Sequence, residues 1–212
     1  MGFYLIRLTT LKQEVSTALK FVLSIISGAK RAVIFFDLDN TLANTWPTLI
    51  KNHSIAIDKN IENETARLLA LEPRMGTIAL FNRLEESNIT RVVLTARPVS
   101  SFDATVQWLK TYVDPRIGAS DNISVNLVST PYLKMLYWIP LKIYGKKIFV
   151  IDDLTYNHEN GTVKEYNILI KSLNFFKIPS IGFKSIQKLN NSSHRDEVKL
   201  LHEEIKRCIL SK

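Results

Sequence analysis

The sequence predicts an α/β protein built on a parallel sheet. Short apolar runs alternate with helical patterns from residue 32 onward, and most runs are apolar throughout rather than at every second position. Strands that alternate with helices form right-handed βαβ units, and continuously apolar strands are buried on both faces. The length of 212 residues suits one such domain and excludes a large two-domain enzyme.

The first thirty residues predict a helix with one apolar face. Residues 10–27 show apolar side chains at helical spacing, namely Leu11, Val15, Leu19, Val22, Leu23 and Ile26. The uncharged apolar run at residues 21–29 is shorter than the roughly 18 residues that span a bilayer, so we expect no transmembrane helix. Three interpretations stay open. The helix packs on the domain, lies in a membrane interface beside its basic residues, or is a signal peptide, which Glu14 and Lys20 disfavour.

Strands and helices then alternate along the chain. We predict strands at residues 32–37, 91–95, 123–128, 147–152 and 180–183. We predict helices at residues 60–71, 76–86, 102–112, 131–138, 162–176 and 195–210. Residues 1–30 are expected to form an N-terminal amphipathic segment, and residues 31–212 one domain with a small helical cap or flap at about 43–75.

Acidic residues follow the first and fourth predicted strands. Asp37 and Asp39 stand two residues apart, and Asp152 is followed by Asp153. Ligands in such sheets bind beyond the carboxyl ends of the strands, and neighbouring like charges need a cation or a shared proton. Because carboxylate oxygens suit Mg²⁺, these four residues are candidate metal ligands. An Asx turn or a helix cap is the structural alternative for the first pair.

Groups that can bind an anion lie at the same predicted edge. The second strand ends in Thr95, Ala96 and Arg97, which offer a hydroxyl, a backbone N–H and a guanidinium. Lys134 begins the helix after the third strand, and Lys142 competes with it for the same role. Thr95, Ala96, Arg97 and Lys134 are therefore candidate substrate-binding residues in a metal and phosphate site.

The run VIFFDLDNTL, then VVLTARP, then Lys134, then IFVIDD, resembles the four ordered motifs of the haloacid dehalogenase-like (HAD) superfamily. The resemblance covers residues 32–183. It implies a Rossmann-like sheet of strand order 5-4-1-2-3, a Mg²⁺ cofactor and a covalent aspartyl intermediate. It implies that Asp37 is the nucleophile and a metal ligand. Asp39 would be the general acid and base, with its backbone carbonyl on the metal.

The same resemblance gives roles to the remaining motif residues. Thr95 would hydrogen-bond the phosphoryl group, and Lys134 would neutralise charge on Asp37 and on the phosphoryl oxygens. Asp152 would complete the metal site, with Asp153 as a second ligand or a support. Because Asp39 is present, the chain resembles the phosphate-handling branch rather than the halide-removing one. The phosphomutase branch also keeps this residue and stays open.

Three further residues are candidates near this site. Trp46 follows the first motif, where the family's flap guards the entrance, and it either packs in the flap or stacks on substrate. Asn157 follows the fourth motif, where relatives often place a residue near the metal. His158 is a candidate substrate contact on the same loop. Each is alternatively an ordinary loop residue.

The expected function is that of a Mg²⁺-dependent phosphomonoester hydrolase that acts through an aspartyl-phosphate. The expected substrate is a phosphorylated metabolite such as a sugar phosphate or a nucleotide. A polynucleotide 3′-phosphatase, or a phosphatase of another large substrate, is the alternative, because a small cap leaves the site open. A non-catalytic binding or regulatory module with the same fold is the alternative of a different class.

The net charge of +8 lies mainly in the flanks, since residues 1–36 contribute +4 and residues 184–212 contribute +3. This distribution concerns docking rather than the reaction, with nucleic acid or a membrane reached through the N-terminal helix as candidate partners. An ordinary solvated basic surface is the alternative explanation. The single Cys208 excludes an internal disulfide framework and a cysteine zinc site. It fits a reducing compartment, and we expect a cytoplasmic location.

Overall fold

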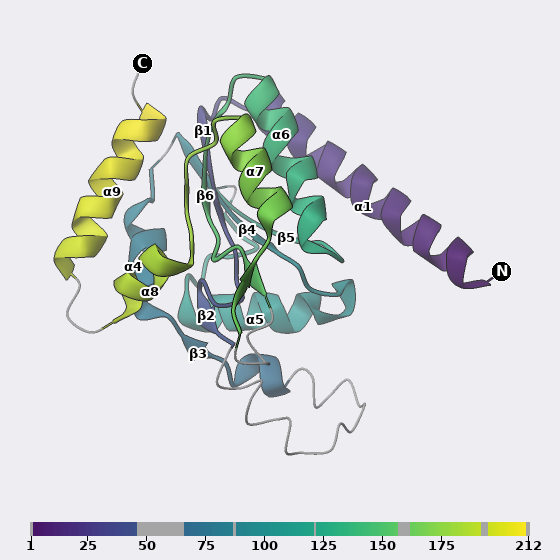
Figure 1. Cartoon of the computed structure of the whole chain (residues 1–212), viewed down its shortest axis with the longest axis horizontal. Helices are drawn as coiled ribbons and strands as arrows, with labels where there is room; N and C mark the ends of the chain where they lie inside the picture. The colour runs from purple at the N-terminus through teal and green to yellow at the C-terminus, as the bar shows by residue number, and fades with distance from the viewer. Residues whose placement is uncertain are drawn as a thin grey trace.

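The computed structural model describes residues 2–45, 66–86, 88–120, 122–156, 162–191 and 195–210. A five-stranded sheet lies between two layers of helices (Figure 1). Its strands are β1 (Ala32–Phe36), β4 (Ile89–Thr95), β5 (Ile123–Leu127), β6 (Lys147–Ile151) and β9 (Ser180–Ile181). Every neighbouring pair in this sheet is parallel, which confirms the predicted α/β class and parallel sheet.

The strands lie in the order β5-β4-β1-β6-β9. These labels differ from the order 5-4-1-2-3 implied by the resemblance, because short strands outside the main sheet also take numbers. From β9 to β5, the main-sheet strands are the fifth, fourth, first, second and third in chain order. The short strands form two antiparallel pairs, β2 (Ala43–Asn44) with β3 (Glu72–Pro73), and β7 (Thr155–Tyr156) with β8 (Lys164–Glu165).

Helices cover both faces of the sheet (Figure 1). One layer holds α1 (Gly2–Ser27), α6 (Met135–Ile143) and α7 (Asn167–Phe175). The other holds α4 (Met75–Arg83), α5 (Phe102–Tyr112), α8 (Phe183–Asn190) and α9 (Arg195–Leu210). The two layers account for the continuous apolar runs of the strands, because both faces of each central strand are covered.

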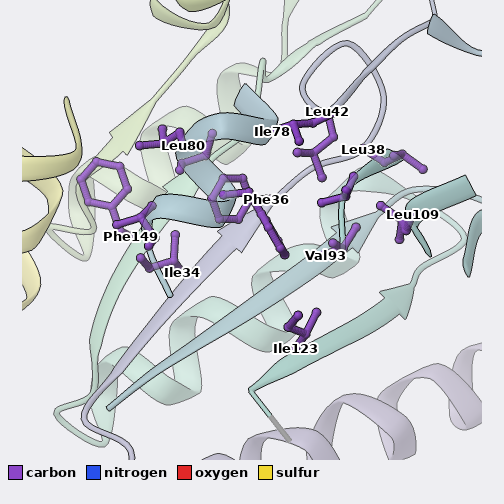
Figure 2. Packing of buried hydrophobic residues seen from close by; sticks show 14 of the residues in the cluster. Ile34, Phe36, Leu38, Leu42, Ile78, Leu80, Val93, Leu109, Ile123 and Phe149 are labelled. Carbon is purple, nitrogen blue, oxygen red and sulfur yellow. The ribbon is translucent and has the colours of Figure 1, made fainter. Parts of the chain in front are cut away.

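Side chains of β1 alternate between the two cores, as successive residues of a strand must. Val33 and Phe35 pack among α1, α6 and α7. Ile34 and Phe36 pack in the opposite core, where Phe36 meets Phe81 of α4 at 4.8 Å between ring centroids. Figure 2 shows this second core, with residues of β1, β4, β5 and β6 converging on α4 and α5.

The N-terminal helix belongs to the first of these cores. Ala18 and Val22 are buried there, and α1 packs along α6. The buried carboxylate of Glu14 accepts hydrogen bonds from the backbone N–H of Ser129, at 2.6 Å, and from its hydroxyl, at 3.0 Å. Packing on the domain is therefore what the structure shows for this helix. In the described part of the chain, no helix is both long and apolar enough to cross a membrane.

Several predicted bounds need correction. The N-terminal helix begins at Gly2 rather than near residue 10. The helix predicted at 131–138 begins as the 3₁₀ turn η2 (Pro131–Lys134) and continues as α6 past Pro140 to Ile143. The helix predicted at 162–176 begins only at Asn167, because Lys164 and Glu165 pair with β7.

Three further elements differ from the sequence prediction or lie partly outside the described residues. The last predicted strand, 180–183, ends at Ile181, and α8 follows as a helix that the sequence analysis did not predict. Two short antiparallel pairs were also not predicted. Of the predicted cap at 43–75, residues 46–65 lie outside the described residues, and residues 66–69 are helical.

Candidate active site

The carboxyl ends of four neighbouring strands bring the predicted site residues together. Asp37 follows β1, and Asp152 follows β6, whose last residue, Ile151, pairs with Phe36. Thr95 ends β4 on the other side of β1, and Lys134 ends η2 after β5. A pocket of about 230 Å³ lies at this edge, lined by both acidic pairs, Ala96, Lys134 and Tyr166 among others. The parallel sheet thus places residues from 37 to 166 around one small cavity.

Three of the four predicted metal ligands form a compact group. Asp37, Asp152 and Asp153 are buried, and each offers a carboxylate oxygen within 4.8 Å of the others. Such a donor set can hold a metal ion, and its all-oxygen character suits a hard divalent cation. The carboxylate of Asp39 lies outside this group.

Lys134 is the cation of this cluster. Its Nζ lies 3.0 Å from Oδ1 of Asp37 and 2.7 Å from Oδ2 of Asp152. Burial lowers the pKa of Lys134, but attraction to Asp152 and Asp37 outweighs burial, so its pKa is raised and it stays charged. Lys134 rather than Lys142 therefore occupies the site, since Lys142 lies at the far end of α6.

Asp37 has an unfavourable environment as a carboxylate. Burial raises its pKa well above the ordinary value, Lys134 opposes this, and Asp152, Asp39 and Asp153 raise it further. Its buried Oδ1 is in contact with the Lys134 ammonium at 3.0 Å. Three buried carboxylates around one lysine leave excess negative charge, which a bound cation would offset.

Local hydrogen bonds hold the second acidic pair in place. The backbone N–H of Leu154 donates to Oδ1 of Asp152 at 2.9 Å, and the Thr155 hydroxyl donates to the carboxylate of Asp153. The N–H of Asp153 donates to the Thr41 hydroxyl at 3.2 Å, which ties this loop to the one after β1. Leu154 has a φ of 54°, a left-handed conformation that bulky residues rarely adopt and that functional sites often retain.

Asp39 is held by two of the four residues predicted to contact substrate, Arg97 and Thr95. Arg97 donates to both of its carboxylate oxygens, from Nε at 2.8 Å and from Nη2 at 2.5 Å. The Thr95 hydroxyl also lies 3.3 Å from Oδ2 of Asp39. Arg97 is buried, whereas a third of the Asp39 side chain is exposed. Asp39 thus sits at the rim of the pocket, paired with a guanidinium rather than with Lys134.

A larger cavity adjoins the pocket on the side of the β7–β8 pair. It encloses about 750 Å³, and Thr155 lines both spaces. Lys164, Lys184 and Tyr156 line the larger cavity. The ring centroid of Tyr156 lies 4.7 Å from that of Tyr166, which lines the smaller pocket. The two tyrosine rings therefore lie side by side between the larger cavity and the smaller pocket.

The sequence analysis missed three residues of this edge, Thr41, Thr155 and Tyr166. Thr41 had a signal, since it lies inside the DLDNTL run. Tyr166 had none, because the unpredicted β7–β8 pair brings it to the pocket. Trp46, Asn157 and His158 lie outside the described residues. No model of a known protein family matches this chain, and no curated protein matches it either.

Proposed function

We propose that this protein is a Mg²⁺-dependent phosphomonoesterase with Asp37 as its nucleophile. The observation that supports this most is the contact of Lys134 with both Asp37 and Asp152 inside the buried acidic cluster. One lysine beside three buried carboxylates leaves negative charge in excess. A purely structural role would not offset this excess, and an uncompensated buried charge costs on the order of 3–5 kcal/mol. A cation together with a phosphoryl group accounts for both the acids and the lysine.

In the proposed reaction, Asp37 is the nucleophile and Asp39 the general acid and base. A carboxylate oxygen of Asp37 attacks phosphorus, the bond to the leaving oxygen breaks, and Asp39 gives that oxygen a proton. Asp39 then takes a proton from a water that attacks the aspartyl-phosphate, which releases inorganic phosphate and restores Asp37. Lys134 offsets negative charge in both steps. Mg²⁺, held by Asp37, Asp152 and Asp153, would supply electrostatic stabilisation of the phosphoryl oxygens.

The pairing of Arg97 with Asp39 must change before Asp39 can transfer a proton. Both oxygens of Asp39 accept hydrogen bonds from Arg97 in the described structure, so one of these oxygens must be freed before it serves the leaving group. Phosphoryl oxygens are strong acceptors for a guanidinium and compete with a carboxylate for it. We therefore assign Arg97 a positioning role, in which one of its hydrogen bonds passes to the phosphoryl group and the other keeps Asp39 oriented.

The adjoining cavity favours a small phosphorylated metabolite with a second polar or anionic part. Its volume of about 750 Å³ falls in the usual range for small-molecule sites. Lys164 and Lys184 supply positive charge there, and Tyr156 supplies an exposed ring face. A sugar phosphate or a nucleotide meets this description, with the phosphoryl group at Asp37 and the remainder beside β7 and β8.

Hydrolysis of p-nitrophenyl phosphate and of a panel of phosphorylated metabolites tests the proposal. We expect activity that needs Mg²⁺, stops with a chelator and falls at least about a thousandfold in Asp37→Asn. Asp103→Asn, an exposed acid on α5, is the matched control and should keep full activity. Mass spectrometry after an acid quench should find one phosphoryl group on Asp37. Equal, metal-independent hydrolysis by wild type and Asp37→Asn would overturn the mechanism.

A further inference from the structure

The edge of the sheet opposite the acidic cluster presents a second surface. The turns before β1, β6 and β9 form it, at residues 28–31, 142–147 and 174–179, and the turn before β4 borders it, since the N–H of Arg31 donates to the carbonyl oxygen of Asn88. We call it the amino-edge surface. Lys146 donates to the carbonyl oxygens of Gly28 and Lys30, at 3.2 and 2.9 Å, so the first two turns are in contact. Figure 1 shows α1, α6 and α7 ending together at this side.

The charge of the amino-edge surface has one sign. Its three turns contain six basic residues and no acidic residue, namely Lys30, Arg31, Lys142, Lys146, Lys147 and Lys177. Arg31, Lys147 and Lys177 are exposed. The bordering turn before β4 carries Glu85 and Glu86, which pair with Arg116 and Lys206. The six positive charges therefore remain in excess and produce a field that attracts an anionic partner.

Large apolar side chains protrude from the same turns. Ile143 is 69% exposed, Tyr144 66% and Phe175 80%. Leu19 and Leu23 of α1 lie one turn apart and are also more than half exposed, which continues the apolar character toward this edge. Soluble proteins expose single apolar residues often, but apolar side chains grouped with basic ones mark an interaction surface.

We propose that the amino-edge surface docks on an anionic lipid membrane. Basic side chains reach the lipid phosphates, while Phe175, Tyr144 and Ile143 enter the boundary between headgroups and acyl chains. Duplex nucleic acid would use the charges, but its bases are already stacked and paired, so it would leave Ile143 and Phe175 without an apolar partner. Because the acidic cluster lies at the opposite edge of the sheet, this docking is independent of the proposed hydrolysis and leaves the pocket open to solution.

Sedimentation with lipid vesicles tests this surface in the whole chain. Wild type should bind vesicles that contain phosphatidylserine, bind phosphatidylcholine vesicles weakly, and lose binding as salt rises. Arg31→Glu with Lys147→Glu should lower the partition coefficient at least about tenfold. Phe175→Asp should lower it to a similar degree, and the large exposed fraction of Phe175 means that the fold should tolerate this change.

Matched controls lie on α9, in the other helical layer. Lys199→Glu removes an exposed basic residue, and Leu200→Asp removes an apolar residue that is 70% exposed. Both should bind vesicles as wild type does. Absence of binding to anionic vesicles, or an equal loss in the α9 variants, would overturn the proposal. So would tighter, salt-sensitive binding to duplex DNA that the Phe175 variant retains, since that result would identify nucleic acid as the partner.

Discussion

Asp39 and Arg97 show how a single side-chain contact changes the role assigned to a residue. The sequence analysis predicted Arg97 as a substrate contact at a strand end, and in the structure Arg97 reaches the pocket through Asp39. Its pairing with Asp39 depends on how both side chains turn at their strand ends, which no spacing along the chain determines. Thr95 likewise contacts Asp39 in this structure, although the sequence indicated a phosphoryl contact.

The Arg97 contact predicts a specific kinetic effect. Arg97→Gln should lower kcat about a hundredfold and change KM much less, because the loss falls on the positioning of the proton donor Asp39. Arg97→Lys should restore little, since an ammonium cannot donate to both oxygens in the fork geometry of a guanidinium. Steady-state kinetics of both variants measure the change in kcat and the change in KM separately. A large rise in KM with unchanged kcat would instead identify Arg97 as a substrate contact alone.

The raised pKa of Asp37 predicts a pH dependence of metal stabilisation. Folded protein without metal binds the Asp37 proton more tightly than the unfolded chain, so this group lowers stability as pH rises through its raised pKa. Mg²⁺ replaces that proton, and its stabilising effect should therefore grow with pH over the same range. Thermal unfolding with and without Mg²⁺ measures this difference. Asp37→Asn should remove most of it, and a Mg²⁺ effect that is constant with pH would contradict the assignment.

At the scale of elements, α4 and α8 make an unusually close approach. A Cβ added to Gly76 would lie 1.8 Å from the carbonyl oxygen of Leu189. The side chain of Asn190 accepts hydrogen bonds from the N–H groups of Gly76, at 2.9 Å, and Thr77, at 3.2 Å, so α8 caps the N-terminus of α4. Arg74, at the N-cap position of α4 itself, makes no capping hydrogen bond. This contact could not be predicted from the sequence analysis, which did not predict α8.

Substitutions at the contact between α4 and α8 should lower the free energy of unfolding, more for a steric clash at Gly76 than for a lost cap at Asn190. Gly76→Ala should cost about 3 kcal/mol or more, because two backbone segments must separate. Asn190→Ala should cost about 1–2 kcal/mol, the usual range for a lost helix cap. Urea unfolding measures both, with Asn174→Ala, exposed on α7, as the control. If Gly76→Ala lowered the free energy of unfolding no more than Asn174→Ala does, α4 and α8 could separate without strain.

Glu14 anchors the N-terminal helix, and its substitution tests that role. In the sequence it appeared only as a charge that interrupts an apolar segment, whereas the structure buries it against Ser129. Glu14→Ala should lower the free energy of unfolding by about 1–3 kcal/mol, since two donors lose their acceptor. Glu14→Gln should cost less. Glu204 is exposed on α9, so Glu204→Ala should match wild type in the same urea titration. If Glu204→Ala lowered the free energy of unfolding as much as Glu14→Ala does, Glu14 would not anchor α1.

At the scale of the molecule, the sheet and the place of the candidate site could be predicted from local sequence patterns. Each apolar run predicts a strand, and the polar residues that follow it predict the edge at which a ligand binds. Contacts between residues far apart in the sequence could not be predicted from these local patterns. The sequence located the excess positive charge in the flanks, while the structure joins Lys30 and Arg31 of one flank to Lys146 and Lys147 of the middle segment. That surface arises only from the pairing of β1 with β6.

The place of α1 in the fold also affects how the chain matures during synthesis. Its buried residues Ala18 and Val22 pack with α6, yet α1 ends at Ser27 and α6 begins at Met135. At ordinary rates of translation, the partner emerges roughly 5 to 20 seconds after α1 is complete. Throughout that interval the nascent helix presents its apolar side to chaperones or to a nearby bilayer, and only the arrival of α6 withdraws it.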